Sequence, residues 1–380
     1  LAEALLRSPH SLQMGEEDLP LLLLPREDPP RILARDAPRR PYRRRQDDLK
    51  SVVHWGQRKL LLSEIEFVTL HGRGCRRVVY AGAAPGVHIP FLRSLFPHLI
   101  FILIDPGEFQ IPAAAEGIRV RREFFTTDLA REYAGDDTLF ISDVRTADPK
   151  IHPWDKVEEM VAQDMAAQME WARALQPRMA MLKFRLPYSA GQTDYLDGDV
   201  YLPVWGPATT TEARLVTDAR SVRSYDHREY EEQMFYFNTV TRTRLYTTPL
   251  VGEGLCESFD SAAELLILQR FLDSLSAQER SALLPAVLPS AGEQPREIAG
   301  VPEEHRLLAA LFLRMGRESS LRGGRHLLTV LPLQAREKWF RAKVFDAKTG
   351  AYVDACSEEG QELLRAQAAS VAEPAGPASG

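Results

Sequence analysis

The chain has few cysteines, no long apolar runs and no strong net charge. Its 380 residues include three cysteines, which lie far apart and form no CxxC pair. This pattern predicts a reducing compartment, no structural zinc and no metal site. The longest apolar runs, such as residues 21–24, are far too short to cross a bilayer, and no signal peptide is recognisable. The sequence therefore predicts no membrane association.

The formal net charge of −6 does not favour nucleic acid as a partner of the whole surface, so any RNA-binding surface must be a local patch. One candidate is the basic run at residues 39–45, which includes Tyr42. Such a run is either a solvated linker or a nucleic-acid-binding arm. The sequence leaves both open.

Composition changes along the chain predict four parts. Residues 1–50 form an N-terminal arm rich in proline and arginine, in which six prolines between 20 and 41 exclude long helices. Residues 51–250 form the core, residues 251–365 form a helical C-terminal region, and residues 366–380 form a disordered tail of Ala, Ser, Pro and Gly.

Apolar runs in the core alternate between strand and helix patterns. We predict strands at residues 77–81, 100–104, 138–142, 179–186 and 212–217, and helices at 57–70, 87–96, 157–175, 262–275 and 302–315. Alternation of this kind is typical of an α/β fold with an open, mostly parallel sheet that is covered on both faces.

A glycine loop, Gly82 to Gly86, follows the first strand and opens a helix. Glycines there allow a tight turn and a close backbone approach to a ligand. Asp105 ends the second strand, where a carboxylate can accept hydrogen bonds from both hydroxyls of a ribose. The middle of the loop is Ala-Ala-Pro and the third glycine of the dinucleotide fingerprint is missing, which argues against an NAD-dependent oxidoreductase.

Four charged residues surround this loop in the order Lys59, Asp143, Lys183 and Glu212. A ribose hydroxyl attacks a sulfonium methyl group only if its proton is removed, and a lysine accepts a proton when burial or another cation lowers its pKa. Lys183 lies within an apolar strand and is our predicted base. Lys59 supplies the second cation, while Asp143 and Glu212 position the amines.

These residues and their surroundings resemble the poxvirus cap-specific mRNA 2′-O-methyltransferases, which also serve as the small, processivity subunit of the viral poly(A) polymerase. The stretches that match, in the family's order, are residues 56–62, 78–89, 103–105, 141–145, 182–185 and 230–238.

The resemblance implies a Rossmann-like methyltransferase core with Lys59, Asp143, Lys183 and Glu212 as the catalytic tetrad. It implies that S-adenosyl-L-methionine is the cofactor and that the acceptor is the ribose 2′-hydroxyl of the first transcribed nucleotide of capped mRNA. The residues that it implies for cofactor binding are Gln57, Tyr80, Gly82, Gly86, Asp105 and Phe125.

For the cap, the resemblance implies stacking of the methylated guanine between Tyr188 and a second aromatic, for which Tyr42 is the nearest candidate, with Glu231 as a carboxylate partner. Methylation makes the guanine cationic, and a cationic base binds well between two aromatic rings and beside a carboxylate. Where the family has a second carboxylate this chain has Ala190, for which Asp194 is a possible substitute. Gly107 replaces an arginine near the ribose-binding acid.

Further expectations concern partners and alternatives. The resemblance implies a heterodimer with the catalytic subunit of a poly(A) polymerase, and a location in the host cytoplasm and the virion. Two alternatives remain: a polymerase subunit that has lost catalysis, although all four tetrad residues are present, and a 2′-O-methyltransferase that acts on uncapped or ribosomal RNA.

Overall fold

A computed structural model gives the structure of the chain. It describes residues 28–42, 56–112, 115–148, 151–207, 209–243, 246, 259–287, 303–318, 343–346, 351–354 and 362. The predicted disordered tail at 366–380 and the end of the basic run, residues 43–45, lie outside these ranges.

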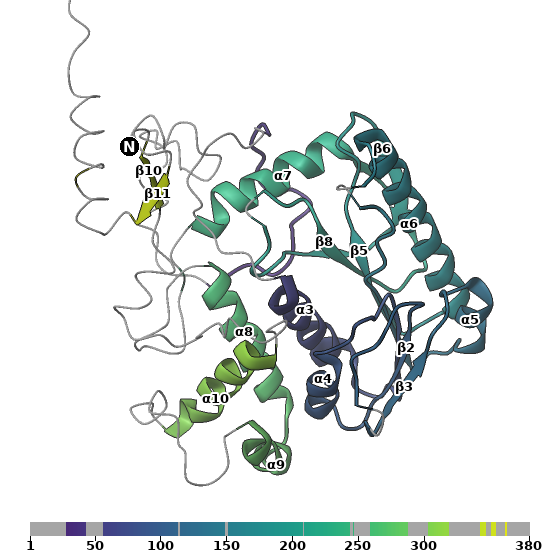
Figure 1. Cartoon of the computed structure of the whole chain (residues 1–380), viewed down its shortest axis with the longest axis vertical. Helices are drawn as coiled ribbons and strands as arrows, with labels where there is room; N and C mark the ends of the chain where they lie inside the picture. The colour runs from purple at the N-terminus through teal and green to yellow at the C-terminus, as the bar shows by residue number, and fades with distance from the viewer. Residues whose placement is uncertain are drawn as a thin grey trace, which may run out of the picture.

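A seven-stranded sheet with the order β3-β2-β1-β4-β5-β8-β7 forms the centre of the fold (Figure 1). The strands are β1 (Arg77–Ala81), β2 (Ile100–Ile104), β3 (Ile118–Arg121), β4 (Thr138–Ser142), β5 (Met179–Phe184), β7 (Asp199–Tyr201) and β8 (Ala213–Thr217). The first five are parallel, and β8 is antiparallel to both β5 and β7. The prediction of a mostly parallel, Rossmann-like α/β sheet is confirmed. The predicted bounds of β1, β2 and β4 match those observed.

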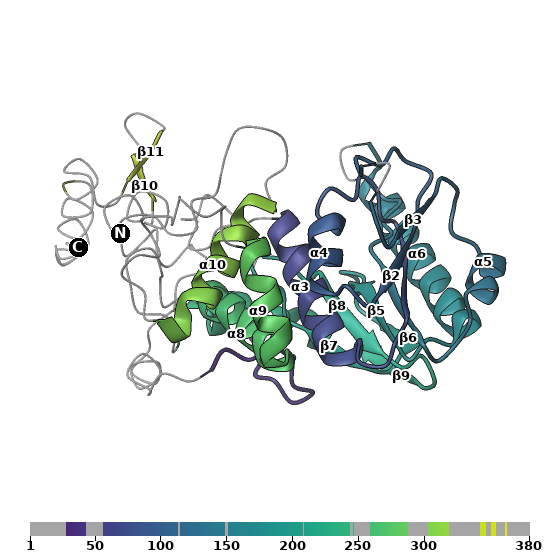
Figure 2. The same ribbon diagram turned by 90° about the horizontal axis from the view of Figure 1, so that it is seen from below.

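The central strands β1, β2 and β4 are almost wholly buried, as expected for apolar strands that are covered on both faces. Helices α3 (Gly56–His71), α4 (Ile89–Leu95), α8 (Phe259–Ser274), α9 (Ala277–Val287) and α10 (Glu303–Glu318) lie on one side of the sheet (Figure 2). Helices α5 (Thr127–Glu132) and α6 (Trp154–Leu175) lie on the other. Since α8 packs against α3, the predicted C-terminal region contributes to the covering of the core.

Shorter elements complete the structure. Strands β6 (Gln192–Leu196) and β9 (Val222–Asp226) pair in a separate two-stranded sheet, and β9 leads into α7 (His227–Thr239) and a 3₁₀ turn, η1 (Thr241–Thr243). Asp226 caps α7 by accepting a hydrogen bond from Glu229 N. Strands β10 (Lys343–Asp346) and β11 (Ala351–Asp354) pair within the region that the sequence predicts as helical.

The described part of the N-terminal arm, residues 28–42, is attached to the core. Leu33 N donates to Val200 O of β7 at 2.8 Å, and Arg40 N donates to Glu232 O of α7 at 3.2 Å. The Arg31 guanidinium, which is buried, donates to both carboxylate oxygens of Glu66 on α3. This part of the arm is therefore held against the core through its backbone and through Arg31.

Among the described helices, none combines the length and the apolar character that crossing a membrane requires.

Candidate active site

The predicted site residues meet at one edge of the sheet, at the point where the strand order reverses. Strand β2 lies on one side of β1 and β4 on the other, so the chain leaving β1 opens into a crevice. The glycine loop follows β1, Asp105 follows β2, and Asp143 follows β4. This is the edge at which open α/β sheets bind their ligands.

Two glycines of the loop have conformations and surroundings that exclude other residues. Gly82 has φ +76°, and a Cβ atom there would lie 2.9 Å from the backbone nitrogen of Val144. Gly86 has φ +67°, and its Cβ would lie 2.9 Å from the Ile111 side chain. The loop is thus a bare backbone cradle beside the end of β4, which is what a close ligand approach requires.

Asp105 is hydrogen-bonded to backbone groups at this edge. Its Oδ2 accepts from Ala84 N at 3.2 Å, and its Oδ1 accepts from Gly107 N at 2.7 Å. Each carboxylate oxygen has a second lone pair, so the side chain can still accept from the two hydroxyls of a ribose. Gly107 belongs to this turn, and an added Cβ there would come within 3.0 Å of Asp105 Oδ1.

The four predicted catalytic residues form a connected chain of charges. Lys59 Nζ of α3 lies 2.8 Å from Glu212 Oε1, and Lys183 Nζ of β5 lies 3.1 Å from Asp143 Oδ1. Lys183 Nζ also lies 3.9 Å from Glu212 Oε2, which joins the two pairs. The side chains are 13–25% exposed, so the group is partly shielded from water yet can be reached.

A fifth residue, Arg214, was missed by the sequence argument. It is on β8 next to Lys183 in register, and its Nη2 lies 2.6 Å from Asp143 Oδ1. Because β8 is antiparallel to β5, its first residues lie at the carboxyl edge of the parallel strands, and the two-residue period of a strand places Arg214 on the same side as Glu212. The sequence feature that could have revealed Arg214 is the presence of an arginine within an otherwise apolar strand.

Arg145, in the loop after β4, also faces the tetrad. Its Nη2 lies 3.9 Å from Glu212 Oε2 and its Nη1 lies 3.7 Å from Asp164 Oδ2, and neither nitrogen makes a hydrogen bond. Burial lowers the pKa of Arg145, against the opposing effect of Glu212 and Asp164. The two carboxylates of the tetrad are therefore surrounded by two lysines and two arginines.

Burial and charge shift the protonation equilibria in this cluster. Burial lowers the pKa of Lys59, although Glu212 acts to raise it. For Asp143 and Glu212, burial acts to raise the pKa, but the neighbouring cations outweigh it and hold both values below the ordinary range. Both carboxylates stay ionised at neutral pH, and burial favours the neutral form of Lys59.

Two residues predicted to contact the cofactor have side chains that point into the protein. Tyr80 is 1% exposed and donates its hydroxyl proton to Glu64 Oε1 at 2.7 Å, so only its backbone faces the loop. Phe125 is 8% exposed and stacks on Phe140, with Trp171 at its edge. Gln57 is the second residue of α3 and is half-buried. The predicted cofactor roles of these three residues stay predictions.

The predicted cap-binding aromatics lie together beside the tetrad. The Tyr42 and Tyr188 ring centroids are 6.4 Å apart at an interplanar angle of 42°, and Tyr42 packs edge-on against Phe235 of α7. Glu231 lies one helical turn before Phe235, and burial raises the pKa of its carboxyl group. Asp194, the predicted substitute for the missing cap carboxylate, is exposed on β6.

Two residues at the start of α6, Trp154 and Glu158, contact Tyr188, and the sequence argument missed both. Trp154 has its ring centroid 5.5 Å from that of Tyr188. Glu158, one turn along the helix, accepts hydrogen bonds from Tyr188 N at 3.2 Å and from Arg185 Nη2 at 2.7 Å. The Arg185 guanidinium lies 4.8 Å from the centroid of the Tyr188 ring.

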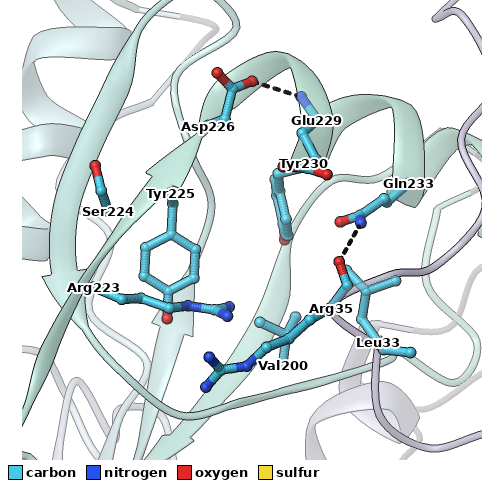
Figure 3. A pocket seen from close by; sticks show the side chains of 11 residues that line it. Leu33, Arg35, Val200, Arg223, Ser224, Tyr225, Asp226, Glu229, Tyr230 and Gln233 are labelled. Carbon is cyan, nitrogen blue, oxygen red and sulfur yellow. Dashed lines mark hydrogen bonds between the residues drawn. The ribbon is translucent and has the colours of Figure 1, made fainter.

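A cavity of about 80 Å³ lies elsewhere, between the N-terminal segment, β9 and the start of α7 (Figure 3). The guanidinium groups of Arg35 and Arg223 face each other there, and Asp197 forms an ion pair with each. Arg223 also covers the ring of Tyr225, with 4.0 Å between guanidinium and centroid. None of the predicted site residues lines it, and its two arginines share the carboxylate of Asp197, so we assign the cavity to the docking of the N-terminal segment.

The strand order, the glycine cradle and the charges above it define a Rossmann-like fold of the methyltransferase type. A family model described as "Poly A polymerase regulatory subunit" matches residues 39–262, more than half of the chain. The chain belongs to this family.

Curated relatives and a solved structure are similar to parts of the chain. Proteins called "Cap-specific mRNA (nucleoside-2'-O-)-methyltransferase" from myxoma virus (strain Lausanne) and fowlpox virus (strain NVSL) are each 28% identical to it. The matches cover 52% and 50% of this chain, and 64% and 68% of the relatives. The chain thus spans less than two thirds of the myxoma protein.

A solved structure, "The structure of bluetongue virus VP4 reveals a multifunctional RNA- capping production-line", is 12% identical with a TM-score of 0.37. That match covers 60% of this chain and 40% of the other, and so weak a likeness carries no argument.

Proposed function

We propose that this protein transfers a methyl group from S-adenosyl-L-methionine to the ribose 2′-hydroxyl of the first transcribed nucleotide of capped mRNA. The observation that carries the proposal is the connected chain from Lys59 through Glu212 and Lys183 to Asp143, directly beside the glycine loop. The family and the curated relatives support it, since the relatives are named for this reaction.

The loop and Asp105 fit the proposed cofactor. The backbone of Gly82 and Gly86 leaves room that a side chain would fill, and Asp105 retains acceptor capacity for ribose hydroxyls. When bound, adenosylmethionine supplies a methyl group on a positively charged sulfur. The carboxylate of Asp143, which follows β4 at the same edge, is the nearest charge of the tetrad to the loop in the strand order.

Lys183 is the proposed acceptor of the proton. The glycine loop and Asp105 would hold adenosylmethionine, which would supply the methyl group, and the Lys183 amine would take the proton that the ribose 2′-hydroxyl loses. Asp143 Oδ1 positions that amine at 3.1 Å, and Arg214 and Arg145 add two further cations beside the carboxylates of Asp143 and Glu212. Lys59, whose pKa burial lowers, is the second candidate for this role.

The decisive experiment is incubation with labelled adenosylmethionine and short RNAs that end in a methylated cap, an unmethylated cap or no cap. We expect transfer to the methylated-cap RNA, and loss of transfer in Lys183→Ala by roughly 10²–10⁴-fold with cofactor binding kept. Transfer to uncapped RNA at an equal rate would favour the ribosomal or uncapped substrate instead. No transfer to any RNA, with cofactor bound, would favour a subunit without catalysis.

Cap selectivity is the finer part of the proposal. Tyr188→Ala and Glu231→Gln should each reduce the preference for methylated over unmethylated guanosine caps more than they reduce RNA binding in general. The first removes a stacking face of about 1–3 kcal/mol, and the second removes the charge opposite a cationic base. Since Ala190 replaces a carboxylate, we expect modest selectivity in the parent protein. Unchanged cap binding by both variants would place the cap elsewhere.

A second function is proposed because the chain belongs to the poly A polymerase regulatory subunit family. We infer that it binds the catalytic subunit of a poly(A) polymerase and makes tail extension processive. The poly(A) tails that this subunit synthesises should be longer when the protein is present. The Lys183→Ala variant should lengthen them as much as the parent does. Failure of both forms to lengthen tails or to bind the partner would leave only the methyltransferase proposal. The host cytoplasm and virion stay predicted locations.

The basic run at residues 39–45, with Arg121, Arg122 and Arg185, is our predicted track for the nascent strand, and two of these arginines already have acidic partners. Arg121 is ion-paired with Glu123 and Glu132, and Arg185 is ion-paired with Glu158. These carboxylates already neutralise the two arginines, so phosphates gain less there than the sequence suggested. Of the track residues that the structure describes, Arg122 is exposed and has no such ion pair among the described residues.

A further inference from the structure

Two large apolar side chains are exposed at the start of α6, beside the predicted cap pocket. Ile151 is 74% exposed and Trp154, the first residue of the helix, is 53% exposed. Exposed apolar side chains that occur singly need no explanation, but an indole within one turn of an isoleucine and beside a candidate site does. We call Ile151 and Trp154 the α6 ledge.

The ledge is joined to the tetrad through two chain segments. Asp143 begins the loop that leads to Trp154, and Tyr188, which contacts Trp154, accepts a hydrogen bond from the hydroxyl of Thr211 at 2.9 Å. Thr211 directly precedes Glu212. The indole is therefore linked to Glu212 of the tetrad through Tyr188 and Thr211.

Neither Tyr42, at 6.4 Å, nor Trp154, at 5.5 Å, leaves room for a base against Tyr188 as the rings stand, and the indole is the nearer of the two. A base between two rings needs about two stacking steps of 3.4 Å, roughly 7 Å in total. The Trp154 and Tyr188 centroids are 5.5 Å apart at 33°, so the two rings are already in contact. Tyr188 is fixed by Glu158 at its backbone nitrogen, which holds the pair together. The second face of the indole is what remains for a ligand.

We propose that Trp154 stacks an unpaired base of the transcribed RNA, separate from the methylated guanine of the cap. The inference rests on the proposed function, because it assumes an RNA acceptor at the tetrad. Stacking on an aromatic ring accepts any base, since every base has a π-face. It suits an enzyme that must hold transcripts of different sequences in one position.

The charges around the ledge indicate that it binds through the base and not the phosphates. The first turns of α6 carry the carboxylates of Asp155, Glu158 and Glu159. Glu159 is paired with Lys156 at 2.8 Å and Glu158 with Arg185 at 2.7 Å, so neither of these cations is left for a phosphate. Acidic side chains repel the RNA backbone, so Trp154 should contribute affinity without a change in the number of phosphates neutralised.

The test compares three ligands in the parent protein, Trp154→Ala and Trp154→Phe. The ligands are 7-methylguanosine triphosphate, which has no transcribed base, a capped five-nucleotide RNA, and the same RNA without a cap. Trp154→Ala should bind both RNAs roughly 5- to 150-fold more weakly and the cap analogue as the parent does. Trp154→Phe should retain most of the affinity. The slope of RNA affinity against salt should be the same in all three proteins.

Fluorescence gives an independent readout. The capped RNA should quench indole emission in the parent more than the cap analogue does, and Trp154→Phe should lose that extra quenching while it still binds the RNA. Thermal unfolding of the variants should match the parent, because the indole is largely exposed.

Each contrary result overturns the inference in a different way. RNA binding by Trp154→Ala that equals the parent's means that no base stacks there. An equal loss for the cap analogue places Trp154 in the cap pocket. If the parent methylates capped RNA while Trp154→Ala binds it unchanged, this inference fails and the proposed function stands. If the parent neither binds nor methylates RNA, both fail.

Discussion

Two neighbouring residues on α3, Arg58 and Lys59, form ion pairs of opposite character. Arg58 has no exposed surface and donates to Glu264 of α8, with Nε 2.7 Å from Oε2. The same carboxylate accepts from the Trp205 indole at 2.7 Å, and the Arg58 guanidinium lies 5.1 Å from the Phe312 ring centroid on α10. Lys59 pairs with Glu212, and both side chains retain some exposure, 14% and 25%.

The difference shows how a charged pair is assigned to structure or to chemistry. The Arg58 pair lies between α3, α8, Phe312 of α10 and Trp205, and neither of its side chains has exposed surface, so no ligand reaches it. Burial raises the pKa of Glu264 even though Arg58 opposes the shift, which reveals the cost of desolvating the pair. The Lys59 pair has further cations nearby and an open side toward the loop, where a substrate can approach.

The largest effect that we expect comes from breaking the closed pair. Arg58→Met strands the carboxylate of Glu264 in the interior and should lower the free energy of unfolding by about 3–5 kcal/mol. Denaturant unfolding measures this. The matched control is the double variant Arg58→Met with Glu264→Gln, which should recover part of the loss because no charge is left unpaired. If Arg58→Met is as stable as the parent, the pair is not structural.

The neighbouring substitution should have the opposite profile. Lys59→Met removes a lysine whose charged form is disfavoured by burial, and Glu212 keeps Lys183 and Arg145 within 3.9 Å, so stability should change little. Methyl transfer should fall about 10²–10³-fold, as when one electrostatic group is removed from an active site. The measurement pairs denaturant unfolding with single-turnover transfer. A large loss of stability with an intact rate would mean that the Lys59–Glu212 pair is structural and not catalytic.

A smaller effect should follow from a change at Asp105, which accepts its described hydrogen bonds from backbone amides. Asp105→Ala should weaken adenosylmethionine binding by about 1.5–3 kcal/mol, because a hydrogen bond to a charged group is lost. The Ala84 and Gly107 amides lose their acceptor as well, so part of the loss reflects a looser loop. Calorimetry checks the affinity. Unchanged affinity would mean that the cofactor lies elsewhere.

The smallest effect concerns a third charged pair that α3 forms, between Glu64 and His88. Burial acts to lower the pKa of His88, but Glu64 outweighs it and the net pKa is raised. A raised pKa in the folded state gives stability that is present in full below pH 6.5, the ordinary value, and is lost as pH rises through the folded pKa. His88→Gln should therefore cost about 1 kcal/mol at pH 6 and less at pH 9.

Unfolding of the parent and of His88→Gln at several pH values tests this prediction. The Tyr80 hydroxyl, which shares Glu64 with His88, stays protonated across that range because burial raises its pKa. A difference between the two proteins that does not depend on pH would show that His88 stays neutral in the folded state.

Local patterns in the sequence were enough for much of the fold. The apolar runs at 77–81, 100–104 and 138–142 are the strands β1, β2 and β4 with the same bounds, because a buried strand needs only consecutive apolar residues. The glycine loop, Asp105 and Asp143 follow those strands in the chain, so parallel pairing alone brings them to one edge. The order of the tetrad was likewise visible in the sequence.

Other features depend on pairing between distant segments, which no local pattern specifies. The antiparallel register of β8 places Glu212 and Arg214 at the carboxyl edge of β5, and a parallel β8 would have carried them to the opposite edge. The contacts of Trp154 and Tyr42 with Tyr188 join α6, the N-terminal segment and the loop after β5. Arg58 and Lys59 are adjacent in sequence but differ in burial, because successive helical residues point about 100° apart. The packing of α8 and α10 against α3 decides that the side chain of Arg58 is the one in the interior.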